Sequence, residues 1–174
     1  HKRDYCDFLK NEYKLNFSLL ATSGDLISGR FIDFDKELYK PDVDIFTKGY
    51  YTNSFHIDVD SRLPGYKKIQ LEGLFHEICN GGCITYIELG EAPLGNEESL
   101  EEYINIAVEA GVHYLGFNFP KDVCNDCGTT GVFDFCPKCK SKNITRIRRV
   151  SGYLEILDGF TKGKKAEEKN RRKN

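Results

Sequence analysis

Two Cys-x-x-Cys pairs are the clearest chemical signal in this sequence of 174 residues. The first pair is Cys124 and Cys127, the second is Cys136 and Cys139, and eight residues separate the pairs. Each short turn lets both of its sulfurs point at one ion, and four thiolates suit tetrahedral Zn2+. The spacing therefore predicts a structural zinc knot, because four protein ligands leave no position for a catalytic water.

Other chemistry remains open to these cysteines, since four thiolates also bind iron, and cysteines can form disulfides or stay free. Seven cysteines in all, four of them in metal-binding spacing, favour a reducing compartment. We expect the remaining three, Cys6, Cys79 and Cys83, to be small buried or surface thiols.

Gly152 is the second candidate for chemistry. It follows a predicted strand over residues 144–150, and a glycine in that place predicts an ordinary turn. Its surroundings change this interpretation. The sequence from Arg148 to Leu154, Arg-Arg-Val-Ser-Gly-Tyr-Leu, resembles the glycyl-radical loop of anaerobic (class III) ribonucleotide reductases, which follows a four-cysteine zinc knot near the C-terminus.

The resemblance covers residues 15–160. Three further segments carry it: Tyr51-Thr-Asn-Ser-Phe-His56, Asn80-Gly-Gly-Cys-Ile-Thr-Tyr86 and Tyr114-Leu-Gly-Phe-Asn-Phe-Pro120. Two departures stand out. Cys83 occupies a position where the family has His, and Thr22-Ser-Gly-Asp-Leu26 replaces a Thr-Pro-Ala-Glu-Gly-like turn. A turn of this kind before a helix is either a phosphate cradle, with Thr22 and Ser23 as contacts, or an ordinary helix cap.

The resemblance implies an oxygen-sensitive anaerobic ribonucleoside-triphosphate reductase, an enzyme that makes deoxyribonucleotides. A separate activase, with an iron–sulfur cluster and S-adenosylmethionine, removes a hydrogen atom from the Cα of Gly152. The radical passes to a cysteine thiol, the thiyl takes the 3′-hydrogen of the ribonucleoside triphosphate, and water leaves from the 2′ carbon. The four knot cysteines bind zinc, and the whole enzyme is a homodimer.

None of the three other cysteines lies in a context that matches the thiyl position. The chain also starts at His1 and contains no methionine. We therefore expect a C-terminal piece that needs the remainder of the reductase. Arg148 and Arg149 either position the loop, meet the activase or face solvent.

A glycyl radical suits a residue without Cβ, because its Cα must become planar between two amides. It must also be kept from water and oxygen. We expect the loop to be buried, pinned by the knot on one side and by the apolar residues after it on the other. Those residues are Tyr153, Leu154, Ile156 and Leu157.

Composition indicates a soluble globular protein, with 40% hydrophobic and 30% charged residues and a net charge of −2. No apolar run approaches the ~20 residues of a membrane helix, and no signal peptide is visible. We expect a cytoplasmic protein with no membrane contact.

The predicted elements alternate, which is typical of an α/β fold with parallel strands. We expect strands at 15–21, 83–89, 112–119 and 144–150, and helices at 3–14, 27–38, 66–79 and 99–110. The resemblance makes this α/β unit a partial parallel-strand barrel, part of a larger ten-stranded barrel. The expected parts are barrel at 1–120, zinc knot at 121–143, glycyl-radical loop at 144–160 and a basic, disordered tail at 161–174.

The tail holds seven Lys or Arg and two Glu. A basic end of this kind is a solvated, frayed segment or a nucleic-acid contact. Two alternative functions remain open: a spare-part radical domain that replaces a damaged C-terminus, and a zinc-ribbon binding module.

His56 is a further candidate for a functional site, either as a ligand contact or as a satisfied polar group.

Overall fold

The computed structural model describes residues 2–24, 27–39, 44–150 and 152–174. The helices are α1 (Lys2–Tyr13), α2 (Ile32–Leu38), α3 (Asp44–Lys48), α4 (Gly65–His76), α5 (Glu97–Glu109), the 3-10 helix η1 (Leu157–Gly159) and α6 (Lys162–Asn170). The strands are β1 (Thr85–Glu88), β2 (Leu115–Asn118), β3 (Lys121–Cys124), β4 (Thr130–Gly131), β5 (Ile144–Val150) and β6 (Tyr153–Ile156). Among these described residues, no helix is both long and apolar enough to cross a bilayer.

A parallel sheet forms the first part of the fold. Strands β1 and β2 pair in parallel, with Thr85 opposite Leu115 and Glu88 opposite Asn118. The segment before β1 adds a parallel bridge between Gly82 and Leu20. The predicted α/β class is confirmed, and parallel pairing holds for β1 and β2. The predicted strand at 144–150 was expected in the same parallel unit, but as β5 it pairs antiparallel with β3 and β6. The predicted strand at 15–21 is reduced to this single bridge.

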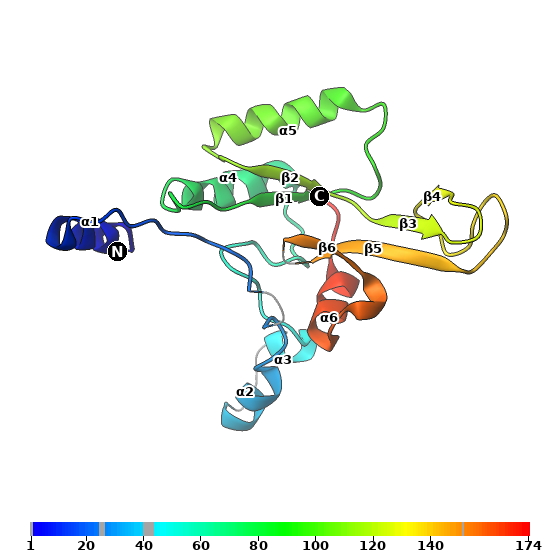
Figure 1. The fold of residues 1–174 in the computed structure, drawn as a ribbon, viewed down its shortest axis with the longest axis horizontal. Coiled ribbons are helices and arrows are strands. Elements are labelled where there is room, and N and C mark those ends of the chain that lie inside the picture. Colours follow the sequence, from blue (N-terminus) through cyan, green and yellow to red (C-terminus); the bar gives the residue numbers. More distant parts are fainter. Residues whose placement is uncertain (1, 25–26, 40–43, 151) are drawn as a thin grey trace.

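Two helices cover the parallel sheet and create the hydrophobic core. Helices α4 and α5 lie along β1 and β2 (Figure 1), and Ile69, Ile87 and Ala107 form the buried centre between them. Both helices were predicted from apolar residues at helical spacing. Only part of each predicted apolar face is buried, since Leu74 of α4 and Val108 of α5 are exposed.

A second, antiparallel sheet extends from the first, with strand order β4-β3-β5-β6 (Figure 1). Cys124 at the end of β3 pairs with Ile144 at the start of β5, and Val150 at the end of β5 pairs with Tyr153. The cysteines and Gly152 thus lie at opposite ends of β5, separated by about 20 Å of strand.

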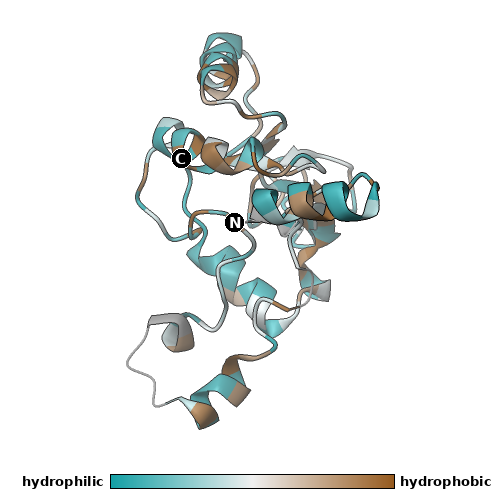
Figure 2. Ribbon diagram, turned by 90° about the vertical axis from the view of Figure 1, so that its left-hand side faces the viewer, coloured by the Kyte–Doolittle hydropathy of each residue, from teal (hydrophilic) through white to brown (hydrophobic). Residues whose placement is uncertain are grey.

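The N-terminal helices stand away from the core. The predicted helix over 27–38 is shortened to α2, because residues 27–30 form a turn whose Ser28 carbonyl accepts from the Tyr51 amide at 2.6 Å. Asp25 and Leu26 of the proposed phosphate cradle lie outside the described residues. Large apolar side chains such as Phe8, Phe34 and Leu38 are exposed on α1 and α2. Figure 2 shows such hydrophobic residues on α2, the helix at the bottom of the view.

The expectation of a disordered tail at 161–174 was wrong. Most of it forms α6, whose first turn is capped by the Thr161 hydroxyl accepting from the Lys164 amide at 3.4 Å. Three charged side chains of the segment, Lys164, Glu167 and Arg171, are only 1%, 7% and 14% exposed. Ion pairs with residues far away in the sequence hold the segment, and a local reading of charge could not reveal them.

Candidate active site and metal centre

The four predicted metal ligands come together. All four Sγ atoms lie within 4.8 Å of one another, and the Cys124–Cys139 and Cys127–Cys136 pairs are each separated by 3.5 Å. A zinc ion with bonds of about 2.3 Å places tetrahedral sulfurs about 3.8 Å apart, so these thiols fit the ion. The donor set is four sulfurs, which suits a soft, tetrahedral metal such as zinc.

Backbone turns prepare the thiols for a metal. The Gly128 amide donates to the Cys124 carbonyl and the Lys140 amide to the Cys136 carbonyl, each at 2.9 Å. The backbone N–H of Cys139 also donates to the Cys136 sulfur, and this lowers the pKa of the Cys136 thiol to about 6. The Thr129 hydroxyl lowers the pKa of Cys127. Both effects favour the thiolate, which is the form that binds metal.

Gly152 occupies the turn of a tight hairpin. Val150 pairs with Tyr153, so two residues make the connection, and Gly152 has φ +115°. This backbone conformation is open to glycine and strained for other residues. A Cβ built at Gly152 would meet no described atom within 4 Å. The obstacle to a side chain here is the backbone angle, with no steric clash.

The expected burial of the glycine loop is not seen within this chain. Gly152 is exposed, as are Tyr153, Leu154 and Ile156, with 40%, 56% and 51% exposure. The apolar residues after Gly152 therefore do not enclose it. Protection from water must come from elsewhere.

Two hollows meet at Gly152. One has a volume of about 530 Å³ and the other about 1020 Å³, including open solvent. Both are lined by Ser23, His56, Tyr86 and Gly152. The sequence segments that carry the family resemblance thus converge at the glycine hairpin from distant parts of the chain. Thr22 lines the larger hollow only, and no described contact shows a phosphate cradle.

Glu72 is a site residue that the sequence did not reveal. Its fully buried carboxylate lies 3.3 Å from His56 Nδ1 and accepts from the Ile57 amide at 2.9 Å. The His56 side chain is therefore held by Glu72 of α4, and it lines both hollows. A single glutamate within a helix gives no sequence signal, since it is usually a solvated residue.

Of the three remaining cysteines, Cys6 is apart from the other two, and the side chains of Cys79 and Cys83 contact each other. Cys6 lies on α1, far along the chain from the hairpin, whereas Cys79 and Cys83 are buried beside the turn before β1. Cys83 lines the larger hollow, and burial raises the pKa of its thiol to about 11. This thiol is protonated at neutral pH and is a poor nucleophile.

The two arginines before Gly152 have different partners. Arg148 donates to the buried carboxylate of Asp122 at 2.7 Å and lies 3.5 Å from Glu168 of α6. Asp122 also accepts from the Phe133 amide at 3.0 Å, within the loop that joins the two cysteine pairs. Arg149 instead donates to the Tyr86 hydroxyl at 2.9 Å. These contacts hold β5 in place, so neither arginine is a freely solvated side chain.

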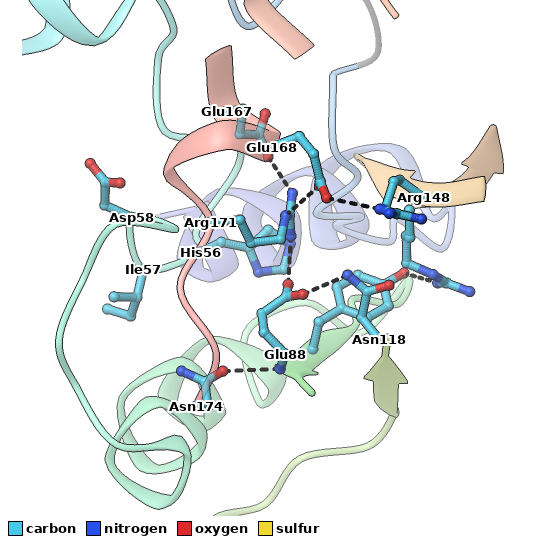
Figure 3. A network of polar contacts seen from close by, with 12 residues as sticks. His56, Ile57, Asp58, Glu88, Asn118, Arg148, Glu167, Glu168, Arg171 and Asn174 are labelled. Carbon is cyan, nitrogen blue, oxygen red and sulfur yellow. Dashed lines mark hydrogen bonds and ion pairs between the residues drawn. The ribbon is translucent and has the colours of Figure 1, made fainter. Parts of the chain in front are cut away.

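Arg171 is the centre of a network of charged side chains (Figure 3). Its guanidinium contacts Glu88 of β1 at 2.5 Å, Glu167 at 2.8 Å and Glu168 at 3.2 Å. Glu88 also accepts from the Asn118 amide group at 2.5 Å. Burial raises the pKa of Glu167, one of whose oxygens has no hydrogen-bond partner among the described residues. The network joins β1, β2 and α6.

Comparisons with known proteins agree with these features. A family model described as anaerobic ribonucleoside-triphosphate reductase matches residues 1–174. The anaerobic ribonucleoside-triphosphate reductase of Escherichia coli K12 is 37% identical over 182 residues, covering 97% of this chain and 25% of the relative. The protein of the same name from Enterobacteria phage T4 is 35% identical, covering 87% of this chain and 26% of the relative.

Solved structures show the same fold. A chain named anaerobic ribonucleotide reductase superposes with a TM-score of 0.78 at 22% identity, covering 99% of this chain and 27% of that one. The anaerobic ribonucleotide reductase of Thermotoga maritima with MES in the active site gives a TM-score of 0.72 at 22% identity, covering 91% of this chain and 26% of that one. The present chain thus spans about a quarter of the length of the relatives it matches.

Proposed function

Because the chain belongs to the anaerobic ribonucleoside-triphosphate reductase family, we propose that it is the C-terminal portion of such an enzyme, carrying the radical glycine. The observation that carries the proposal is the position of Gly152. It lies in a hairpin turn at the junction of two hollows, and the same sheet holds a four-cysteine cluster. The substrate class is ribonucleoside triphosphates, and the location is the cytoplasm.

In this proposal, Gly152 stores the unpaired electron. An activase with an iron–sulfur cluster and S-adenosylmethionine takes one hydrogen atom from its Cα, leaving a radical delocalised over two amides. The glycyl radical then takes a hydrogen atom from a cysteine thiol in the remainder of the reductase, and this leaves a thiyl radical on that cysteine. That thiyl takes the 3′-hydrogen of the substrate, water leaves from the 2′ carbon, and an external reductant, formate or a thiol protein, supplies the electrons.

The residues of this chain then have three tasks. Cys124, Cys127, Cys136 and Cys139 would hold a structural Zn2+, and their full tetrahedron leaves no open position for substrate. His56 and Tyr86 line the hollows beside Gly152 and shape the space next to the radical. The remaining three quarters of the enzyme, which is a homodimer in this proposal, completes the walls and shields the exposed glycine.

The alternatives are less well supported. A nucleic-acid-binding tail requires free basic side chains, but three of the seven in this segment, Lys164, Arg171 and Arg172, pair with carboxylates of this same chain. A spare-part radical domain would carry the same Gly152 chemistry. No feature of the described residues favours it over a portion of a complete reductase.

The test uses the intact reductase under anaerobic conditions with its activase and S-adenosylmethionine. We expect a doublet in the electron paramagnetic resonance spectrum, because one hydrogen remains on the radical Cα of Gly152. Gly152→Ala should abolish the doublet. Gly111→Ala is the matched control, since Gly111 also has positive φ and open space where a Cβ would lie. A doublet that persists in Gly152→Ala would contradict the proposal.

A further inference from the structure

The C-terminal strap, residues 161–174, lies against both the glycine hairpin and β1. Its first helical turn packs against the turn at 27–30, where a Cβ on Gly163 would lie 2.8 Å from the Gly29 Cα. Only glycines permit such a close approach of two backbones. At the other end, the Asn174 amide donates to the Glu88 carbonyl at 2.9 Å, and Asn174 Oδ1 accepts from the Glu88 amide at 3.0 Å.

Ion pairs fix the middle of the strap. Arg171 holds Glu88 of β1, and Arg172 contacts Asp60 at 2.7 Å. The Arg171–Glu88 pair is buried, so removing one charge leaves its partner without compensation and is costly. The Arg172–Asp60 pair is more exposed and contributes less. The strap is therefore a fixed platform, anchored to β1 and to the turn at 27–30.

Lys164 projects from this platform to the residue that follows Gly152. Its side chain is 1% exposed, and its ammonium donates to the Tyr153 hydroxyl and to Glu155, each at 2.8 Å. The ammonium also lies 4.8 Å from the centre of the Tyr153 ring. Lysines normally keep their charge in water, so a buried one needs specific partners. Here both partners belong to β6.

We propose that Lys164 is a positioning residue, which through Tyr153 holds the Gly152 turn at the junction of the two hollows. Arg149 fixes the strand that enters the turn by contacting Tyr86, and Lys164 fixes the strand that leaves it. Both sides of a two-residue connection are thereby held. Because radical transfer depends on the separation and orientation of the reacting atoms, a shift of the turn slows the reaction. The inference rests on the proposed role of Gly152.

The experiment compares variants of the intact, activated reductase. Lys164→Met removes the charge and keeps the length, Lys164→Arg keeps the charge, and Tyr153→Phe removes only the hydroxyl. Lys169→Met is the matched control, since Lys169 is exposed on the same helix. For Lys164→Met we expect kcat roughly ten- to a hundredfold lower with KM nearly unchanged. Amide hydrogen exchange in residues 153–156 should become faster, while metal content stays the same.

Lys164→Arg should recover much of the lost kcat, and Lys169→Met should behave like the wild type. Wild-type kcat and exchange in Lys164→Met would overturn the inference. If that variant loses its metal or fails to fold, Tyr153→Phe decides, because it leaves the Lys164–Glu155 pair intact. Lower kcat and faster exchange in Tyr153→Phe support the inference, and wild-type values of both overturn it.

The two proposals fail in different ways. Absence of a Gly152-dependent doublet in the wild type would defeat the proposed function. Unchanged kcat and exchange in a folded Lys164→Met enzyme that still shows the doublet would defeat only the positioning role.

Discussion

Arg149 and Tyr86 join the glycine hairpin to the parallel sheet through two contacts at once. The Arg149 Nη1 donates to the Tyr86 hydroxyl at 2.9 Å, and the guanidinium carbon lies 4.9 Å from the centre of the tyrosine ring. The ring in turn covers Gly116, its partner on β2, where a Cβ would lie 2.7 Å from ring carbons. The glycine on β2 makes room for the side chain that receives the arginine.

Substitutions at Tyr86 should separate the two contacts. Tyr86→Phe keeps the ring and loses the hydroxyl, so we expect a loss of about 1 kcal/mol in local stability. Tyr86→Leu also removes the cation–π contact and should cost roughly another 1 kcal/mol. Hydrogen-exchange protection of β5 and β6 measures both. Equal protection in the wild type and Tyr86→Leu would show that the pair does not hold the hairpin.

Metal removal should disorder the end of the antiparallel sheet. We expect about one zinc per chain, and Cys124→Ser should lose it together with several kcal/mol of local stability, because binding energy in such a site is folding energy. Elemental analysis and exchange of β3 and β4 check this. Cys6→Ser is the control, since Cys6 lies outside the cluster. Full metal content in Cys124→Ser would refute the assignment of this ligand.

The stability of the α4–β1 contact should fall in mild acid because of His76. The His113 amide donates to His76 Nδ1 at 3.0 Å, and His76 Nε2 lies 3.0 Å from the Thr85 hydroxyl. Burial, followed by repulsion from His113, lowers the pKa of His76 below its ordinary 6.5. The folded state thus binds fewer protons than the unfolded state just below pH 6.5.

This stabilisation is fully present above pH 6.5 and is lost as pH falls from there through the folded pKa. One proton gives a slope of at most about 1.4 kcal/mol per pH unit. Protection factors of α4 amides, corrected for intrinsic exchange, should follow that slope in the wild type. His76→Asn retains an acceptor for the His113 amide and should flatten it, whereas His113→Asn should leave most of it. An unaltered slope in His76→Asn would exclude His76 as the cause.

Oxygen should cut the activated chain at its radical. Air reacts with a carbon-centred backbone radical, so we expect cleavage at Gly152 and a short fragment that begins near Tyr153. Mass spectrometry identifies the fragment, and enzyme that has not met the activase is the control. An activated chain that loses its doublet in air but stays intact would count against a backbone radical at this residue.

The sequence was sufficient to predict the features that depend on local spacing. Cys-x-x-Cys turns place their own sulfurs, and apolar residues at helical spacing indicated the helices α4 and α5. Gly152 became a candidate only through family resemblance, because its positive φ and its place beside two hollows depend on distant segments.

The strap could not be predicted for the same reason. Its polar sequence has no apolar face, and its order comes from partners such as Glu88 and Asp60, about a hundred residues earlier in the chain. Glu72 was missed because a carboxylate that orients His56 looks the same in sequence as one that faces water. The shortening of the helix at 27–38 depends on the hydrogen bond from the Tyr51 amide to the Ser28 carbonyl, which is equally non-local.

Asp122 connects the metal centre to the strand that leads to Gly152. This one carboxylate accepts from Phe133, between the cysteine pairs, and from Arg148, four residues before Gly152. Loss of the ion should therefore disturb the link between the loop of the cysteine pairs and the strand that leads to Gly152. Under the proposed role of Gly152, metal-starved cells should accumulate enzyme that resists activation, and returning the ion alone should restore it.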